Sequence, residues 1–301
     1  MKNEIIKEYE KCNICPRECG INRYKQKGYC KMPAQLYLSK AYLHMWEEPS
    51  ISGEKGSGTV FFSGCNLKCI LCQNYKIALG DYGKEVDSEE LANIYLKLQE
   101  KGANNINLVT PSHYIINIAK SLKIAKKRGL KIPVVYNTSS YDKVESLKIL
   151  EGLVDIYLAD FKYMESDIAY KYSKAENYSK IAKKAIKEMY RQTGENVFGE
   201  DGLMRKGVII RHLVLPGHKE DSKKIIKFLY SEYGDKVYLS IMNQYTAVRN
   251  LPYENLNRKV EDKEYEEIID YAIKIGVENA YIQEGGTVSE SFIPDFDLEG
   301  I

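Results

Sequence analysis

The sequence predicts an α/β protein in which strands and helices alternate as a partial, TIM-like (βα)6 barrel. Two observations support this fold class. From Thr59 onward, short β-branched and aromatic runs alternate with longer segments whose apolar residues recur at helical spacing. These helical segments are long enough to serve as crossover connections, which join parallel strands. A chain of 301 residues can also bury a core of this size.

Each predicted strand is a short apolar run, and each predicted helix carries an apolar stripe with a start or stop signal. The segment TVFFS at 59–63 is an example of such a strand. The segment that begins at Ser88 and ends before Gly102 is an example of such a helix. The strands are expected at 59–63, 105–110, 132–136, 154–160, 208–215, 237–242 and 280–283. The helices are expected at 88–101, 112–128, 141–151, 165–194, 219–233 and 262–275.

Three regions are expected along the chain. Residues 1–57 have an irregular pattern and carry four cysteines, so we interpret them as an N-terminal extension. Residues 58–285 form the core barrel, and residues 286–301 form a C-terminal tail. Active sites of α/β barrels lie at the carboxyl ends of the strands, so functional residues are expected there.

Composition excludes several classes of function. The 44 basic and 42 acidic side chains nearly cancel, which gives no electrostatic reason to expect a nucleic-acid partner. No apolar run reaches the length of about 18 residues that a membrane span requires. The charged start Met1-Lys2-Asn3-Glu4 does not resemble a secretory signal. We therefore expect a cytoplasmic protein without a membrane partner, in a compartment that keeps thiols reduced.

The seven cysteines lie within residues 12–72, and the following 229 residues contain none. They form one group of four and one group of three. Two tight groups in a reducing compartment indicate metal ligands rather than disulfides. The groups are Cys12, Cys15, Cys19 and Cys30, and then Cys65, Cys69 and Cys72.

The second group has the spacing C-x3-C-x2-C and directly follows the first predicted strand. Thiolates on a short loop suit an iron–sulfur cluster or zinc. Three thiolates leave one iron of a four-iron cluster without a protein ligand, and an open position is what a catalytic metal centre needs. A structural zinc site would need a fourth ligand nearby, and His44 and His113 are not at zinc-finger spacing, so zinc is the weaker alternative.

This cysteine motif after the first strand of a barrel resembles the radical S-adenosylmethionine (SAM) superfamily. Further segments are similar to the pyruvate formate-lyase activating enzyme group, and more closely to a branch of it with an N-terminal C-x2-C-P-R-x-C motif. Two positions depart from the pattern of the group: Leu71 replaces an aromatic residue, and Thr110-Pro111-Ser112-His113 replaces a glycine-rich segment. The similar segments are GEKGSGTVFFSGCNLKCILCQN, Asp160-Phe161-Lys162, Arg211-His212-Leu213-Val214-Leu215-Pro216-Gly217, Glu47-Glu48-Pro49 and Met242-Asn243-Gln244-Tyr245.

The resemblance implies a radical SAM barrel with two cofactors. Cys65, Cys69 and Cys72 would hold a [4Fe-4S] cluster, and the amine and carboxylate of SAM would bind its fourth iron. Electron transfer from the cluster would then cleave SAM to methionine and a radical that abstracts hydrogen from the substrate. The implied partners are an electron donor such as flavodoxin or ferredoxin, and a glycyl radical enzyme or another protein substrate.

Polar residues at the predicted strand ends are candidates for binding SAM. The resemblance implies that Asn137, Thr138 and Ser139 contact the ribose, and that Asp160 and Lys162 contact the methionyl or ribose groups. A ligand with a carboxylate, an amine and a sulfonium needs such converging polar groups. Two structural alternatives remain: strand ends tolerate polar residues, and residues 137–139 can act as a helix N-cap before Tyr141.

No catalytic residue is assigned, because hydrogen abstraction by a radical needs no general base. Three histidines are candidates for an acid–base role: His113, His212 and His218. The loop position of His113 favours it over the other two. Glu47-Glu48-Pro49, beside Trp46, is interpreted as a cover for the cluster, as a recognition site for a partner, or as an ordinary surface turn.

The N-terminal cysteines can supply four thiolates, which would close a tetrahedral zinc site or saturate a second iron–sulfur cluster. Spacing does not separate these alternatives. A metal centre there would either pin the loop-rich segment or relay electrons toward the SAM cluster, and a group without metal is the remaining alternative. For the whole chain, three functions remain: an activase of a glycyl radical enzyme, a radical SAM enzyme acting on another peptide or a small molecule, or a non-catalytic zinc- or cluster-binding interaction protein.

Overall fold

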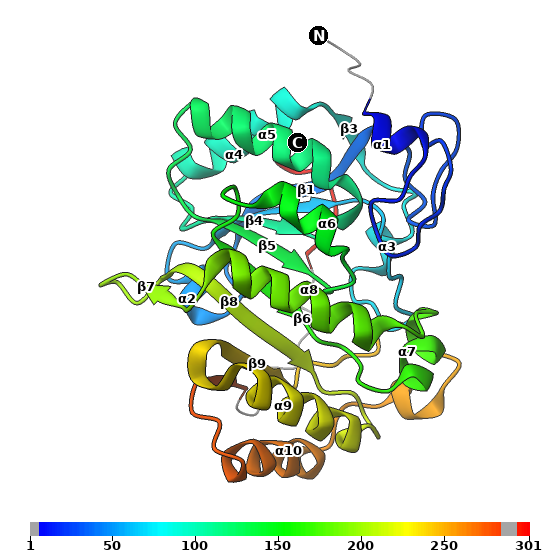
Figure 1. Ribbon diagram of the computed structural model, residues 1–301, viewed down its shortest axis with the longest axis vertical. Coiled ribbons are helices and arrows are strands. Elements are labelled where there is room, and N and C mark those ends of the chain that lie inside the picture. The colour runs from blue at the N-terminus through cyan, green and yellow to red at the C-terminus, as the bar shows by residue number, and fades with distance from the viewer. Residues whose placement is uncertain (1–5, 284–293) are drawn as a thin grey trace.

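The computed structural model describes residues 6–283 and 294–301, and it confirms the α/β class (Figure 1). Ten strands form the sheet, in the order β10-β9-β8-β6-β5-β4-β2-β1-β3, with β7 paired to β8 outside this path. The neighbours from β2 through β10 are all parallel. Within residues 6–283 and 294–301 the edge strands β3 and β10 do not pair, so the barrel is partial and open.

Each of the seven predicted strands overlaps a strand of the parallel part of the sheet. Their central residues are almost all buried, as expected for strands covered on both faces. The bounds are β2 (Ser57–Phe62), β4 (Ile106–Val109), β5 (Val134–Thr138), β6 (Ile156–Asp160), β8 (Met204–Leu213), β9 (Tyr238–Met242) and β10 (Ala280–Ile282).

Helices connect these strands and cover the sheet (Figure 1). In α4 the side chain of Asp87 accepts from the backbone of Glu90, and the side chain of Glu90 accepts from the backbone of Asp87, so the helix starts with a capping box. The longer helices are α4 (Ser88–Glu100), α5 (Ile115–Lys127), α7 (Ser166–Ser173), α8 (Tyr178–Thr193), α9 (Lys219–Tyr233) and α10 (Asp262–Lys274). The one-turn helices are α1 (Lys7–Glu10), α2 (Pro49–Ser52), α3 (Tyr75–Ala78) and α6 (Val144–Leu147).

Two predicted helices differ from the structure. The helix expected at 141–151 begins only at Val144 and continues as a 3-10 turn, Lys148–Leu150. The helix expected at 165–194 is broken between α7 and α8, because Lys174 takes a left-handed conformation with φ +49° and caps α7. This break matters for function, since it places Ser173 beside the cysteine loop.

The predicted extension 1–57 is not irregular throughout. Leu36–His44 form β1, which pairs antiparallel with β2 and with β3 (Lys84–Val86). The polar pair Ser39 and Lys40 obscured this strand in the sequence, because their partners come from distant segments. The Ser39 hydroxyl lies 2.6 Å from that of Ser63, and the amine of Lys40 lies 2.9 Å from a carboxylate oxygen of Asp297.

The C-terminal residues lie along β1, where the backbone N–H of Ala41 donates to the carbonyl of Glu299 at 2.9 Å. Residues 286–293 of the predicted tail lie outside the described residues. A two-residue strand, β7 (Val197–Phe198), forms a hairpin with β8, which starts earlier than predicted. None of the described helices has the length and apolar character that crossing a membrane requires.

Candidate active site

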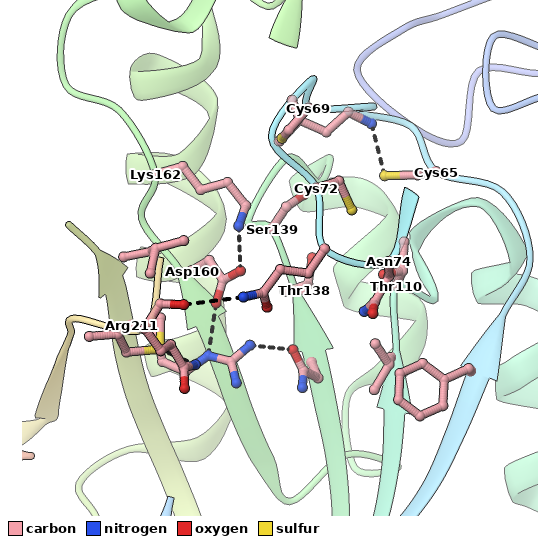
Figure 2. A pocket seen from close by; sticks show the side chains of 18 of the residues that line it. Cys65, Cys69, Cys72, Asn74, Thr110, Thr138, Ser139, Asp160, Lys162 and Arg211 are labelled. Carbon is pink, nitrogen blue, oxygen red and sulfur yellow. Dashed lines mark hydrogen bonds and ion pairs between the residues drawn. The ribbon is translucent and has the colours of Figure 1, made fainter. Parts of the chain in front are cut away.

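A cavity opens at the carboxyl ends of the parallel strands, where α/β barrels place their active sites (Figure 2). Six successive strands contribute to its wall, so the site depends on the whole sheet rather than on one loop. The residues at or just inside these strand ends that line the cavity are Phe61, Val109, Asn137, Asp160, Leu213 and Met242.

The loop between β2 and α3 carries Cys65, Cys69 and Cys72, and all three line this cavity. Gly64 starts the loop with φ +83°, a conformation that favours glycine. The backbone N–H groups of Leu67 and Lys68 lie 3.4 and 3.5 Å from the sulfur of Cys65. The hydroxyl of Ser173 donates to the sulfur of Cys69 at 3.0 Å. The loop therefore presents hydrogen-bond donors to sulfur, as a thiolate cluster requires.

The three thiols interact electrostatically. Burial, together with the neighbouring Cys69 and Cys65, raises the pKa of Cys72 to about 12. Burial also raises the pKa of Cys65, with Cys69 as the next cause. Three ionised thiolates in this position therefore need a cation, and a metal centre supplies one.

The donor set fits a cluster with one open corner. All three cysteines are free thiols on one side of the cavity, and space remains beside them. The acidic side chains that share the cavity, Asp160 and Glu47, are already engaged in ion pairs. Among the described residues, no three His, Cys, Asp or Glu side chains lie close enough together to hold a single metal ion.

Arg211 organises the polar half of the cavity. Its guanidinium donates to Asp160 at 2.8 Å, to Glu47 at 2.9 Å and to the side-chain oxygen of Asn137 at 2.6 Å. Lys162 donates to the other carboxylate oxygen of Asp160 at 2.7 Å. Figure 2 shows Lys162 and Asp160 between the cysteines and Arg211. The network thus joins three strand ends to a segment that follows β1.

The network determines the ionisation of its members. Burial alone would raise the pKa of Asp160, but Arg211 and Lys162 outweigh it and hold the pKa below its usual value. Burial likewise opposes the charge on Lys162, yet Asp160 and Cys69 raise its pKa. Asp160 is therefore a carboxylate and Lys162 an ammonium at neutral pH, which gives the cavity groups for both charged ends of an amino acid.

The five residues predicted to bind SAM, Asn137, Thr138, Ser139, Asp160 and Lys162, all line the cavity. The alternative of a helix cap at 137–139 does not match the structure, because α6 starts at Val144 without a side-chain cap. Thr138 instead donates to Asp142 at 2.5 Å.

Tyr178 holds two of these strand ends together, a role that the tyrosine-rich composition concealed. Its hydroxyl lies 2.8 Å from the carbonyl of Ser139 and 2.9 Å from that of Asp160. It also accepts from the backbone N–H of Lys162 at 2.9 Å.

The histidine preferred from sequence, His113, does not line the cavity. It is buried, its Nε2 lies 2.7 Å from the carbonyl of Ser63, and burial lowers its pKa to about 3. The prediction of an acid–base role is therefore wrong for this residue, which is structural. His212 is also buried, between Phe161 and Ser222. His218 pairs with the hydroxyl of Tyr172.

Sequence reasoning missed the central role of Arg211 and Glu47. The sequence left the role of the acidic motif at Glu47 and Glu48 open. In the structure Glu47 lines the cavity, and its carboxylate accepts hydrogen bonds from Arg211 and Asn107. A charged residue inside an apolar strand, as Arg211 is in β8, was the available signal. Buried charges need partners, so it pointed to acidic residues at the same strand ends.

Comparison with known proteins identifies the family. The model of the radical SAM superfamily matches residues 59–229, more than half of the chain, and this protein belongs to that superfamily. The family implies a [4Fe-4S] cluster and SAM as cofactors, and the three-thiol loop and the polar cavity fit both. The prediction of a radical SAM barrel is thus confirmed.

Three known proteins are similar to this chain in sequence or in structure. The uncharacterized protein MJ0674 of Methanocaldococcus jannaschii is 31% identical over 293 residues, which is 93% of this chain and 80% of the relative. The crystal structure of Streptococcus suis SuiB bound to precursor peptide SuiA has a TM-score of 0.51 and 16% identity, and covers 74% of this chain. This chain spans only 47% of SuiB, so the likeness concerns the fold.

A domain of a pyruvate-formate lyase-activating enzyme from Bacteroides vulgatus is also similar. Its TM-score is 0.39 at 16% identity, covering 57% of this chain and 92% of the other. That value is too low to assign this chain to the activating-enzyme branch.

Proposed function

We propose that this protein is a cytoplasmic radical SAM activase that abstracts hydrogen from a glycine of a glycyl radical enzyme. The observation that carries the radical SAM part is that the three-thiol loop and the Lys162–Asp160–Arg211 network line one cavity. The activase part rests on the motifs that resemble the activating-enzyme group, which run in order along most of the chain. Flavodoxin or ferredoxin is the proposed electron donor.

In this proposal, Cys65, Cys69 and Cys72 hold the cluster, and the polar cavity holds SAM. When bound, the two cofactors supply radical chemistry that removes hydrogen from an unreactive C–H bond. The residues of the chain bind, orient and shield. Lys162 would hold the carboxylate of SAM, Asp160 would hold its amine or ribose, and Asn137, Thr138 and Ser139 would contact the ribose. Arg211 holds Asp160 and Asn137 in these positions.

The first experiment tests SAM cleavage. Anaerobic reconstitution with iron, sulfide, SAM and a strong reductant is expected to release 5′-deoxyadenosine. Cys69→Ala should abolish this release, whereas Arg205→Gln, on an exposed ion pair that does not line the cavity, should leave it unchanged. A reconstituted protein that binds iron but releases no 5′-deoxyadenosine would contradict the enzyme proposal and favour a non-catalytic role.

The second experiment tests the substrate. Mixing the reduced enzyme and SAM with a glycyl radical enzyme encoded beside it should generate a glycine-centred signal in electron paramagnetic resonance (EPR). SAM cleavage without such a signal would reject the activase and leave a radical SAM enzyme for another peptide or a small molecule.

A further inference from the structure

The N-terminal cysteine group lies outside the cavity and is not used by the proposed reaction. It occupies the loop between α1 and β1. Its members are free thiols, Cys12, Cys15 and Cys30 are buried, and Cys19 is partly exposed. Tyr9, Ile14 and Met32 are buried in the same core as Cys12 and Cys30, so burial alone does not single these thiols out. Four thiols in one short loop nevertheless match a set of metal ligands.

The geometry brings these thiols together. Backbone hydrogen bonds from Cys12 to Ile21 at 2.8 Å and from Gly20 to Cys12 at 2.9 Å close the first turn. A Cβ added to Gly28 would lie 3.5 Å from the sulfur of Cys30 and 3.7 Å from that of Cys19, so both sulfurs lie beside this glycine. The backbone N–H of Tyr29 also lies 3.3 Å from the sulfur of Cys19.

The N-terminal cysteine loop contacts the loop of Cys65, Cys69 and Cys72 through one side chain. Arg17, between Cys15 and Cys19, donates to the carbonyl of Asn66 at 2.8 Å and to that of Leu67 at 3.3 Å. Both acceptors lie between Cys65 and Cys69. The ring of Tyr29, next to Cys30, lies 4.0 Å from the centre of the guanidinium.

Arg17 also holds the residue that contacts the sulfur of Cys69. Its guanidinium donates to the carbonyls of Ser173 at 2.9 Å and Lys174 at 2.5 Å, and the hydroxyl of Ser173 donates to Cys69. One planar cation thus connects the N-terminal loop, the catalytic loop and the end of α7, a role that the fork of a guanidinium allows and an ammonium does not.

We propose that Cys12, Cys15, Cys19 and Cys30 bind a second iron–sulfur cluster, and that this centre holds Arg17 against the loop of the catalytic cluster. Four thiolates saturate such a cluster, so it has no open iron for a substrate. We assign it a structural role through Arg17. Zinc on the same four thiolates is the alternative, and metal analysis distinguishes the two. Arg17 is a positioning residue. This part of the inference rests on the proposed function.

Metal analysis of the full chain tests the second centre without any SAM chemistry. After anaerobic reconstitution, the Cys65→Ser/Cys69→Ser/Cys72→Ser variant should retain about four irons and four sulfides per chain. The matched variant with Cys12, Cys15, Cys19 and Cys30 replaced by serine should retain the catalytic iron alone. If the first variant holds no metal while the wild type does, the second centre is rejected. If it holds one zinc ion instead, the cluster is rejected.

The role of Arg17 needs a separate readout. Arg17→Lys should keep the N-terminal iron but alter the EPR spectrum of the reduced catalytic cluster and lower the rate of SAM cleavage at saturating SAM. Arg205→Lys, at an exposed ion pair, serves as the control. An Arg17→Lys protein with an unchanged EPR spectrum would overturn the coupling, whatever its stability. The iron content of the triple variant stays informative even if no SAM is cleaved, so the two proposals fail separately.

Discussion

Arg211 and Asp160 lie opposite each other on adjacent parallel strands, and the Nε of Arg211 donates to the Oδ1 of Asp160 at 2.8 Å. Glu47, far away in sequence, accepts from the same guanidinium. The exposed fractions of these three side chains are 11%, 16% and 10%. The charges are therefore largely withdrawn from water, and each depends on the others for compensation.

Removing the cation should destabilise the protein strongly. Arg211→Met leaves Asp160 and Glu47 as buried carboxylates without their main partner, which costs about 3–5 kcal/mol. Urea unfolding should show this as a lower midpoint. Arg205→Met removes an exposed pair with Asp201 and should change the free energy of unfolding by less than about 0.5 kcal/mol. Equal effects of the two variants would contradict the importance of the network.

The hydroxyl of Ser173 should tune the catalytic cluster. It donates to the sulfur of Cys69, and a donor to sulfur stabilises the more negative, reduced state. Ser173→Ala should therefore lower the reduction potential, measured by redox titration with EPR detection. Ser179→Ala, whose hydroxyl donates to the sulfur of Met164, should leave the potential unchanged. A potential that does not fall in Ser173→Ala would argue against this hydrogen bond in the loaded protein.

Replacing Gly64 should destabilise the protein, because the segment of Cys30 and Met32 packs directly against this glycine. A Cβ there would lie 2.2 Å from Met32 and 2.7 Å from the carbonyl of Cys30. Gly64→Ala should cost about 1–2 kcal/mol of backbone strain and about 1–3 kcal/mol of overpacking. Gly152 also has a positive φ but open space around it, so Gly152→Ala should show only the strain. Similar unfolding midpoints for the two variants would contradict the close approach.

His113 should make the protein sensitive to acid. Burial holds its folded pKa at about 3, below the value of about 6.5 expected in the unfolded chain. Between these values the unfolded state binds more protons, so stability is complete above pH 6.5 and falls as the pH decreases toward 3.

His113→Gln removes this titration and should flatten the pH dependence of unfolding between pH 6.5 and 4.5 by about 1–3 kcal/mol. His218→Gln should have a smaller effect, because His218 is only partly buried. If the free energy of unfolding of His113→Gln depends on pH as steeply as that of the wild type, this prediction is wrong.

Local features of the chain were sufficient for much of the fold. Hydrophobic periodicity and turn residues are properties of neighbouring positions, so they located all seven parallel strands and most helices. The C-x3-C-x2-C spacing is equally local, and it pointed to the loop that now lines the cavity. The polar residues at the ends of β5 and β6 could be found for the same reason, since strand ends of a parallel sheet share one edge.

Contacts between distant segments required the tertiary structure. The strand β1 was hidden because Lys40 is balanced by residues near 297–299, and the break after α7 depends on one left-handed residue, Lys174. His113 was favoured for its loop position, yet the fold buries it. Arg17 and Arg211 illustrate the physical reason. The position of a partly buried cation is defined by the oxygens around it, and those oxygens come from segments that no local pattern connects.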